Sequence, residues 1–206
     1  MDKYNINGSA SKYLRKLQST LNTLDPNVVD AAMNVIASVW QAGKQIIVFG
    51  NGGSAITAQH YITAWNKMIP DATGRPFRGR TLLENLGLIT AYANDVSYED
   101  IFLEQLKNIL QSGDLVIAIS GSGNSENVIW AVQYANEHKA ITLGLCGYNG
   151  GRLKQCAQHT VHVNINDMQI CEDVHAIFCH IVMQTLCGYL GEINYIKAIL
   201  DSAVVV

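Results

Sequence analysis

Two glycine- and serine-rich turns constrain the fold of this chain more than any other feature. The turn 50–54 (GNGGS) follows the apolar run 45–49, and the turn 120–125 (SGSGNS) follows the apolar run 114–119. Each turn opens a segment whose apolar residues recur with helical spacing. A short apolar strand, a tight turn and a helix form half of a βαβ unit. Two such halves predict a parallel sheet covered by helices on both faces.

The rest of the chain continues this alternation of strands and helices. Helices are expected at 55–67 and 125–138, and further strands at 140–145 and 160–164. Because crossovers between parallel strands are right-handed, these elements predict an α/β fold, a three-layer, doubly wound sandwich with a mostly parallel sheet.

The ends of the chain are predicted to be helical. Two helices are expected within 9–42, the second beginning near Asp25. The last helix should begin near Asn166, whose side chain would cap it while Gln169 reaches back, and run to about residue 190. We expect one domain over 1–206, with an N-terminal helical segment (1–42) and an α/β core (43–190); no role is assigned to 191–206.

The segment 70–112 is harder to interpret. A strand is expected at 80–83 and a helix at 98–110. Asn94 and Asp95 would then precede a helix and could cap it.

Charge and composition exclude several classes of protein. The formal net charge is −3 and the pI is near 6.0, without the clustered basic face that a nucleic-acid binder needs. The first residues lack the pattern of a signal peptide, and no apolar stretch is long enough to predict a membrane span. Five cysteines without a CxxC pair are typical of reduced thiols. We therefore expect a cytoplasmic protein with no membrane or nucleic-acid partner.

The two turns have the chemistry of a phosphate site. Glycines let backbone N–H groups approach an anion, a helix N-terminus adds partial positive charge, and serine hydroxyls add donors. Such turns lie at the carboxyl ends of parallel strands, where ligands bind. A single turn of this kind could equally serve tight packing and capping, but two in one chain predict that a small phosphorylated ligand binds between them. The candidate ligand-binding residues are Asn51, Gly52, Gly53, Ser54, Ser120, Ser122, Asn124 and Ser125.

A nucleotide site is a weaker interpretation. Gly50, Gly52 and Ala55 match the spacing of the dinucleotide fingerprint, and Asp71 lies at about the distance expected for a ribose contact. Asp71, however, follows a helical segment rather than an apolar second strand. The chain also has no GxxxxGK[ST] loop. We expect no nucleotide cofactor.

Several longer motifs resemble one family. The segments 50–60 (GNGGSAITAQH), 92–102 (YANDVSYEDIF), 120–128 (SGSGNSENV), 145–151 (LCGYNGG) and 172–180 (EDVHAIFCH) occur in the order found in phosphoheptose isomerases of the sugar-isomerase (SIS) domain family. The resemblance implies an SIS fold and a homotetramer with sites at subunit boundaries. The implied reaction isomerises sedoheptulose 7-phosphate, with Asn94 and Asp95 near the sugar.

The resemblance also implies a catalytic set that this chain only partly retains. The family carries a His and a Glu four residues apart on one helix, and a Gln and a His eight residues apart on the last. The Glu and the last His act as base and acid, and in some members all four surround zinc. His60 and His180 match the two histidines, Glu172 stands at the Gln position, and Ala64 replaces the Glu. An aldose–ketose isomerisation needs a base, which alanine cannot supply.

Two outcomes follow from this departure. Either Glu172 serves as the catalytic carboxylate with His180, or isomerisation has been lost or redirected. His60, Glu172 and His180 would also form a His₂Glu set of the type that holds zinc. Residues eight apart on one helix are, however, about 12 Å apart along its axis, so a shared ion would need leaning side chains or a second subunit. The structural alternative is that these histidines are hydrogen-bonded core or interface residues. Likewise Cys171, His175 and Cys179 form a stripe that is more typical of packing than of metal binding.

Two classes of function remain open at this stage. The first is a sugar-phosphate isomerase; the second is a catalytically altered or inactive SIS module that binds a phosphosugar or a protein partner. An oligomer is expected in either case, because the terminal helices carry more apolar positions than one sheet face requires. These positions are Val28, Val35, Ile36, Ile177, Phe178, Ile181, Val182 and Leu186.

Overall fold

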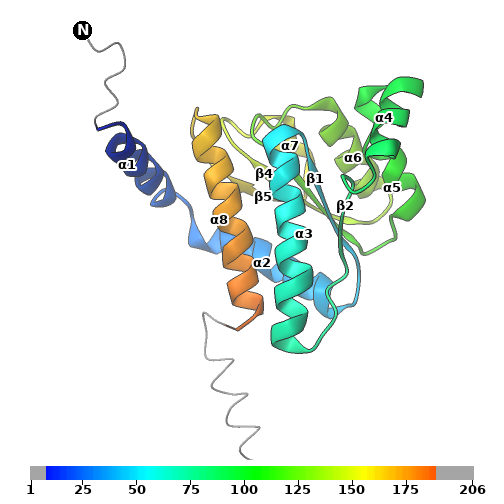
Figure 1. The fold of residues 1–206 in the computed structure, drawn as a ribbon, viewed down its shortest axis with the longest axis horizontal. Coiled ribbons are helices and arrows are strands. Elements are labelled where there is room, and N and C mark those ends of the chain that lie inside the picture. Colours follow the sequence, from blue (N-terminus) through cyan, green and yellow to red (C-terminus); the bar gives the residue numbers. More distant parts are fainter. Residues whose placement is uncertain (1–7, 189–206) are drawn as a thin grey trace, which may run out of the picture.

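A five-stranded parallel sheet forms the centre of the protein. The computed structural model describes residues 8–188. The strand order is β2-β1-β3-β4-β5, and every neighbouring pair is parallel (Figure 1). The strands are β1 (Ile46–Gly50), β2 (Gly79–Thr81), β3 (Leu115–Ser120), β4 (Ile141–Cys146) and β5 (His159–His162). The predicted doubly wound α/β sandwich is confirmed.

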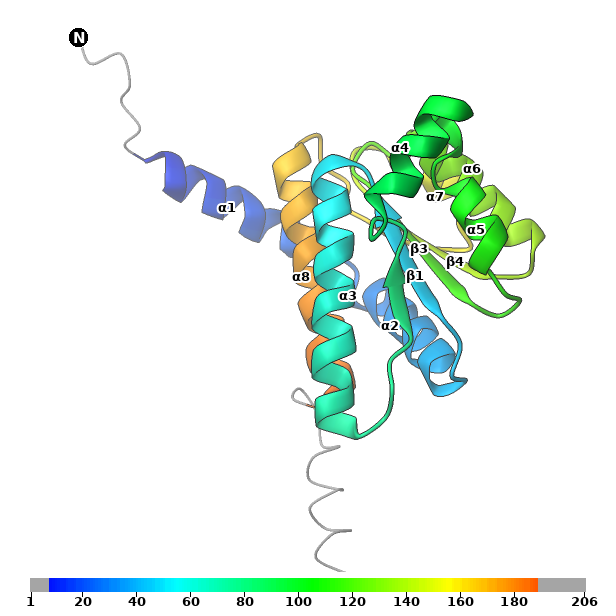
Figure 2. The same ribbon diagram turned by 45° about the vertical axis from the view of Figure 1, so that its right-hand side comes forward.

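Helices cover both faces of this sheet (Figure 2). One face packs against α2 (Pro26–Gln41), α3 (Gly52–Thr73) and α8 (Met168–Leu186). The other packs against α5 (Leu103–Ile109), α6 (Glu126–Glu137) and α7 (Gly151–Cys156). The first helix, α1 (Ser9–Leu21), lies against the start of α8 and reaches away from the body.

The strand pattern explains this two-sided packing. In β1 and β3 every residue is buried, as expected for strands covered on both faces. Successive side chains alternate between the faces, so Val48 joins the α3 side and Phe49 the α5 side.

Helices α3 and α8 lie side by side and run in the same direction (Figures 1 and 2). Tyr61 donates from its hydroxyl to the carbonyl of His175, and Trp65 donates from Nε1 to the carbonyl of Cys179 at 3.1 Å. The step of four residues from Tyr61 to Trp65 on α3 therefore corresponds to the step of four residues from His175 to Cys179 on α8. This register determines which residues of the two helices lie opposite each other.

Two element predictions were wrong in detail. The helix predicted at 55–67 is the longer α3, which continues through Pro70. The last helix begins at Met168, and its N-cap is Asp167 rather than Asn166, with the Asp167 carboxylate accepting from the N–H of Ile170 at 3.2 Å. The predicted start of the second helix near Asp25 is confirmed, and the structure shows that Asp25 caps it, with its carboxylate accepting from the N–H of Asn27 at 2.9 Å. The end predicted near residue 190 and the tail 191–206 lie outside the described residues.

The segment 70–112 differs most from expectation. The predicted helix 98–110 is a 3-10 turn, η1 (Tyr98–Asp100), followed by α5. An additional helix, α4 (Leu86–Asp95), precedes it. Asn94 and Asp95 therefore end a helix, and the cap of η1 is Ser97, whose hydroxyl accepts from the N–H of Glu99 at 3.1 Å.

The apolar positions used to predict an oligomer are not all available to a partner. Ile36, Phe178 and Val182 are buried in the core of this chain, whereas Val28 is 42% exposed. On α1, Leu14 is 62% exposed. Across residues 8–188, no helix combines the length and the apolar character that crossing a membrane requires.

Candidate functional site

The two glycine- and serine-rich turns meet in one pocket at the carboxyl ends of β1 and β3. Its volume is about 200 Å³. Its polar lining comes from the first turn, the second turn and α8, namely Asn51, Ser54, Ser120, Ser122, Ser125 and Glu172; Ile119, Gly121 and Met168 complete it. The structure thus brings together turns that are 70 residues apart, at the edge of the sheet where ligands of such folds bind.

The two turns are joined by a ring of amides. Asn51 donates from Nδ2 to Oδ1 of Asn127 at 2.9 Å, and Asn127 donates back to Oδ1 of Asn51 at 3.0 Å. Tyr98 adds a hydroxyl that donates to the same Asn51 oxygen at 3.0 Å. These bonds fix the start of α3 against the start of α6.

Both helices that open at the pocket lack a side-chain cap. Asn51 is the N-cap of α3 and Ser125 the N-cap of α6, yet neither side chain caps its helix. The first N–H groups of a helix have no intrahelical acceptor and attract anions. Two uncapped N-termini beside serine hydroxyls therefore form an arrangement suited to a phosphate group.

Glycines allow the close approach of these turns. A Cβ at Gly50 would lie 2.5 Å from the carbonyl oxygen of Ile119. Gly123 has φ 66°, and a Cβ there would lie 2.1 Å from the carbonyl oxygen of Gly150. At Gly121 a Cβ would lie 2.3 Å from Sδ of Met168, so the absence of a side chain at 121 makes room for Met168 in the pocket wall.

Within the second turn, some predicted ligand residues shape the turn itself. The hydroxyl of Ser120 accepts from the N–H of Gly123 at 3.2 Å. Asn124 does not line the pocket: its Oδ1 accepts from the N–H of Arg152 at 3.1 Å and ties the turn to α7. Ser122 and Ser125 line the pocket.

Glu172 reaches the pocket from the second turn of α8. Its carboxylate lies over the start of α3, because a Cβ at Gly53 would lie 2.5 Å from Oε1 of Glu172. The side chain is half-buried, and no described group donates a hydrogen bond to it. A carboxylate to which no described group donates is available to a ligand in this pocket.

His60 and His180 form a separate pair farther along the same two helices. Their Nε2 atoms are 2.9 Å apart and the rings meet edge to face. One Nε2 therefore donates and the other accepts. Ala64 lies one turn beyond His60 and packs against the core.

The predicted metal set does not fit this geometry. Gly53 faces Glu172 and His60 faces His180, so the carboxylate and the histidine pair are about two turns, or roughly 11 Å, apart along parallel helices. Within the part of the chain that the structure describes, no three His, Cys, Asp or Glu side chains lie close enough to hold a metal ion. A catalytic zinc takes three protein ligands, and the described residues bring only His60 and His180 together here.

Asn94 and Asp95 lie outside the pocket lining. They end α4, where Nδ2 of Asn94 donates to Oδ1 of Asp95 at 2.7 Å, and both are exposed. Residue-by-residue reasoning missed Asn127 and Tyr98. Both lie in segments that carry the family resemblance, which was the available signal for them.

Comparison with known proteins identifies the family of this chain. The SIS domain family model matches residues 11–147, which is more than half of the chain. The chain belongs to the SIS domain family. A phosphoheptose isomerase of Helicobacter hepaticus is 34% identical over 198 residues, covering 91% of this chain and 97% of that protein. One of Aquifex aeolicus is 34% identical over 164 residues, covering 78% and 85%.

Solved SIS structures confirm the fold. A phosphoheptose isomerase from Francisella tularensis superimposes with a TM-score of 0.81 at 24% identity, covering 88% of this chain and 95% of that one. The predicted resemblance is thereby confirmed for the family and for its fold.

Proposed function

We propose that this chain is a sugar-phosphate isomerase whose substrate phosphate binds between Ser54 and the turn 120–125. The observation that carries the proposal is the joint pocket: two uncapped helix N-termini, three serine hydroxyls of the second turn and one carboxylate converge on the same space. The relatives named phosphoheptose isomerase support the reaction class. The candidate substrate is sedoheptulose 7-phosphate, which the family resemblance implies.

The proposed base is Glu172. Aldose–ketose isomerisation requires a base to remove the proton from the carbon next to the carbonyl, giving an enediol. The same group, now protonated, returns the proton to the neighbouring carbon, while a hydroxyl proton moves to the former carbonyl oxygen. Glu172 suits this role because its carboxylate faces the pocket without a protein partner.

The proposed acid is His180, paired with His60. Within one subunit this pair lies too far along α8 from Glu172 to serve the same two carbons. We therefore propose a homotetramer in which neighbouring subunits share the site. Helix α1 supports an oligomer, because it projects from the body with Leu14 largely exposed (Figure 1). We assign no zinc ligands; zinc is added or omitted only as a condition of the isomerase assay.

A second candidate function is an inactive module that binds a phosphosugar or a protein. Two observations favour it: Ala64 offers no base, and Glu172 is separated from the histidine pair. Such a module would keep phosphosugar affinity but show no turnover.

For both candidate functions we propose that the protein is cytoplasmic, which the five free cysteines support.

The deciding experiment incubates the purified protein with sedoheptulose 7-phosphate, with and without added zinc. Formation of the aldose, followed by NMR, is the expected result. Tight phosphosugar binding without product under both conditions would instead establish the inactive module.

A further inference from the structure

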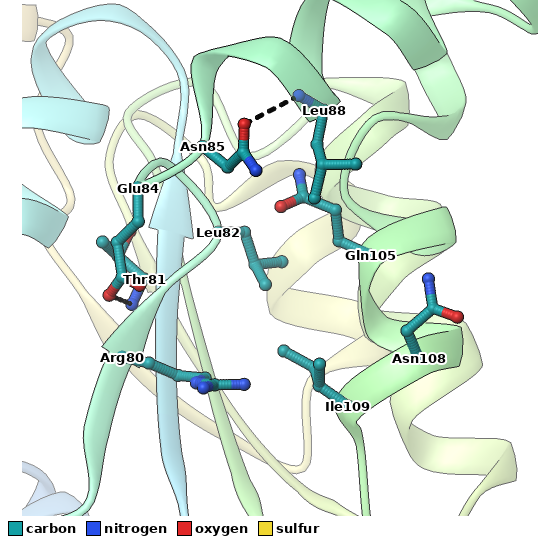
Figure 3. A pocket seen from close by; sticks show the side chains of 9 residues that line it. All are labelled: Arg80, Thr81, Leu82, Glu84, Asn85, Leu88, Gln105, Asn108 and Ile109. Atoms are coloured by element: carbon teal, nitrogen blue, oxygen red, sulfur yellow. Dashed lines mark hydrogen bonds between the residues drawn. The ribbon is translucent and has the colours of Figure 1, made fainter.

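A second cavity, with both apolar and polar lining residues, lies between β2 and α5. Figure 3 shows its lining, and its volume is about 170 Å³. The apolar part of the lining is formed by Leu82, Leu88 and Ile109, and the other lining residues are polar or charged. None of its lining residues lines the serine-turn pocket.

Arg80 brings a positive charge into this cavity. It is half-buried on β2 and points toward Ile109 in Figure 3. Among residues 8–188 its guanidinium has neither an ion pair nor a hydrogen-bond partner, whereas Arg75 and Arg78 donate to carbonyls and Arg152 pairs with Glu126. A partly buried guanidinium without an acceptor is a site for an oxyanion, because its planar donors match carboxylate and phosphate oxygens.

The other polar groups add to this preference. Gln105 is 7% exposed; its Nε2 donates one N–H to the carbonyl of Ile101 at 2.7 Å, and no group of the described chain accepts from the second N–H, which can therefore donate to an anion. Asn85 uses Oδ1 for the N–H of Leu88, which leaves its Nδ2 as a donor at the rim.

The one carboxylate in the lining, Glu84, forms no ion pair with Arg80. Glu84 folds back so that Oε1 accepts from the N–H of Thr81 at 3.2 Å, on the side of β2 away from Gln105 (Figure 3). The rim also includes the N-terminus of the ten-residue helix α4, which adds partial positive charge.

We propose that this cavity binds a small oxyanion, the phosphate or carboxylate group of a metabolite, through Arg80 with Asn85 and Gln105. The volume is below the 300–1,000 Å³ of typical ligand pockets, so the occupant has only a few non-hydrogen atoms. The anion would also hold α4, none of whose residues is buried, against the body of the protein.

The test is calorimetric titration with inorganic phosphate. The starting protein carries Ser122→Ala and Ser125→Ala, so that the serine-turn pocket contributes little to the signal. Adding Arg80→Ala should weaken the remaining phosphate binding by at least about tenfold, the value expected for losing charge-assisted hydrogen bonds. Adding Arg78→Ala, which removes a nearby arginine that already has a partner, should leave it unchanged.

A crystal soaked in arsenate locates the site independently of any variant. The expected result is an anomalous peak beside the Arg80 guanidinium. The proposal is overturned if arsenate occupies only the serine-turn pocket, or if Arg80→Ala leaves phosphate affinity unchanged.

Discussion

The histidine at position 175 should make the stability of this protein sensitive to mild acid. Its side chain is 1% exposed, and neither ring nitrogen makes a hydrogen bond of normal geometry within the described chain. Burial lowers the pKa of His175 from 6.5 to about 4, while the nearby backbone of Cys146 opposes this shift. The folded protein therefore holds His175 neutral.

The direction and size of the effect follow from linkage. The unfolded chain binds a proton at His175 below about pH 6.5, whereas the folded chain does so only near pH 4. The contribution of neutral His175 to the free energy of unfolding is fully present above about pH 6.5 and is lost as the pH falls toward 4. At about 1.4 kcal/mol per pKa unit the full loss is about 3 kcal/mol, of which about 2 kcal/mol is lost between pH 7 and pH 5.

Urea unfolding at fixed protein concentration, from pH 7 to pH 4.5, measures this effect. His175→Leu removes the titrating ring from a buried position, so its free energy of unfolding should fall less with acid than that of the wild type. His138→Gln removes an exposed histidine and serves as the control. If His175→Leu and the wild type lose stability in parallel, His175 does not titrate as proposed.

Three further predictions concern the turns and the assembly. Gly123→Ala should abolish phosphosugar binding, because the new Cβ would collide with the carbonyl oxygen of Gly150. The control is Gly43→Ala: Gly43 has φ 68°, and its new Cβ would have no atom within 4 Å. This control should lose only about 1–2 kcal/mol of stability and should still bind the phosphosugar. Calorimetry and thermal unfolding compare the two, and equal affinities would contradict the tight approach. Ser122→Ala with Ser125→Ala should weaken phosphosugar affinity about tenfold or more, and unchanged affinity would remove the phosphate from this pocket. Light scattering should give four times the 22.5 kDa chain mass, and a monomer at micromolar concentration would refute the shared site.

The layered fold was predictable because it depends on local signals. A continuous apolar strand such as 114–119, followed by a glycine-serine turn, indicates a strand that is buried on both faces. Such strands are typical of parallel sheets. Helix α4 was missed because its apolar residues do not form a single stripe: Ile89 and Tyr92 pack against the core, but Leu86 and Leu88 are apolar and exposed.

The site was predictable only in part, since its geometry depends on packing between distant segments. The sequence placed Glu172 beside the turns, and the structure agrees. The spacing of eight residues already separates Glu172 from His180 along the last helix. The sequence did not show that His60 lies beside His180 rather than beside Glu172, which follows from the parallel register of α3 and α8. The bonds between Asn51 and Asn127 join residues 76 positions apart, and no local pattern predicts them.

Glu172 is proposed to supply the carboxylate that Ala64 lacks. This role is tested by the rate at which the Glu172→Gln variant forms the aldose from sedoheptulose 7-phosphate. The control is Glu137→Gln, which removes an exposed carboxylate at the end of α6. We predict that Glu172→Gln lowers kcat by about 10²–10⁴-fold while KM changes little, and that Glu137→Gln matches the wild type. An active wild type whose kcat is unchanged in Glu172→Gln would contradict the account.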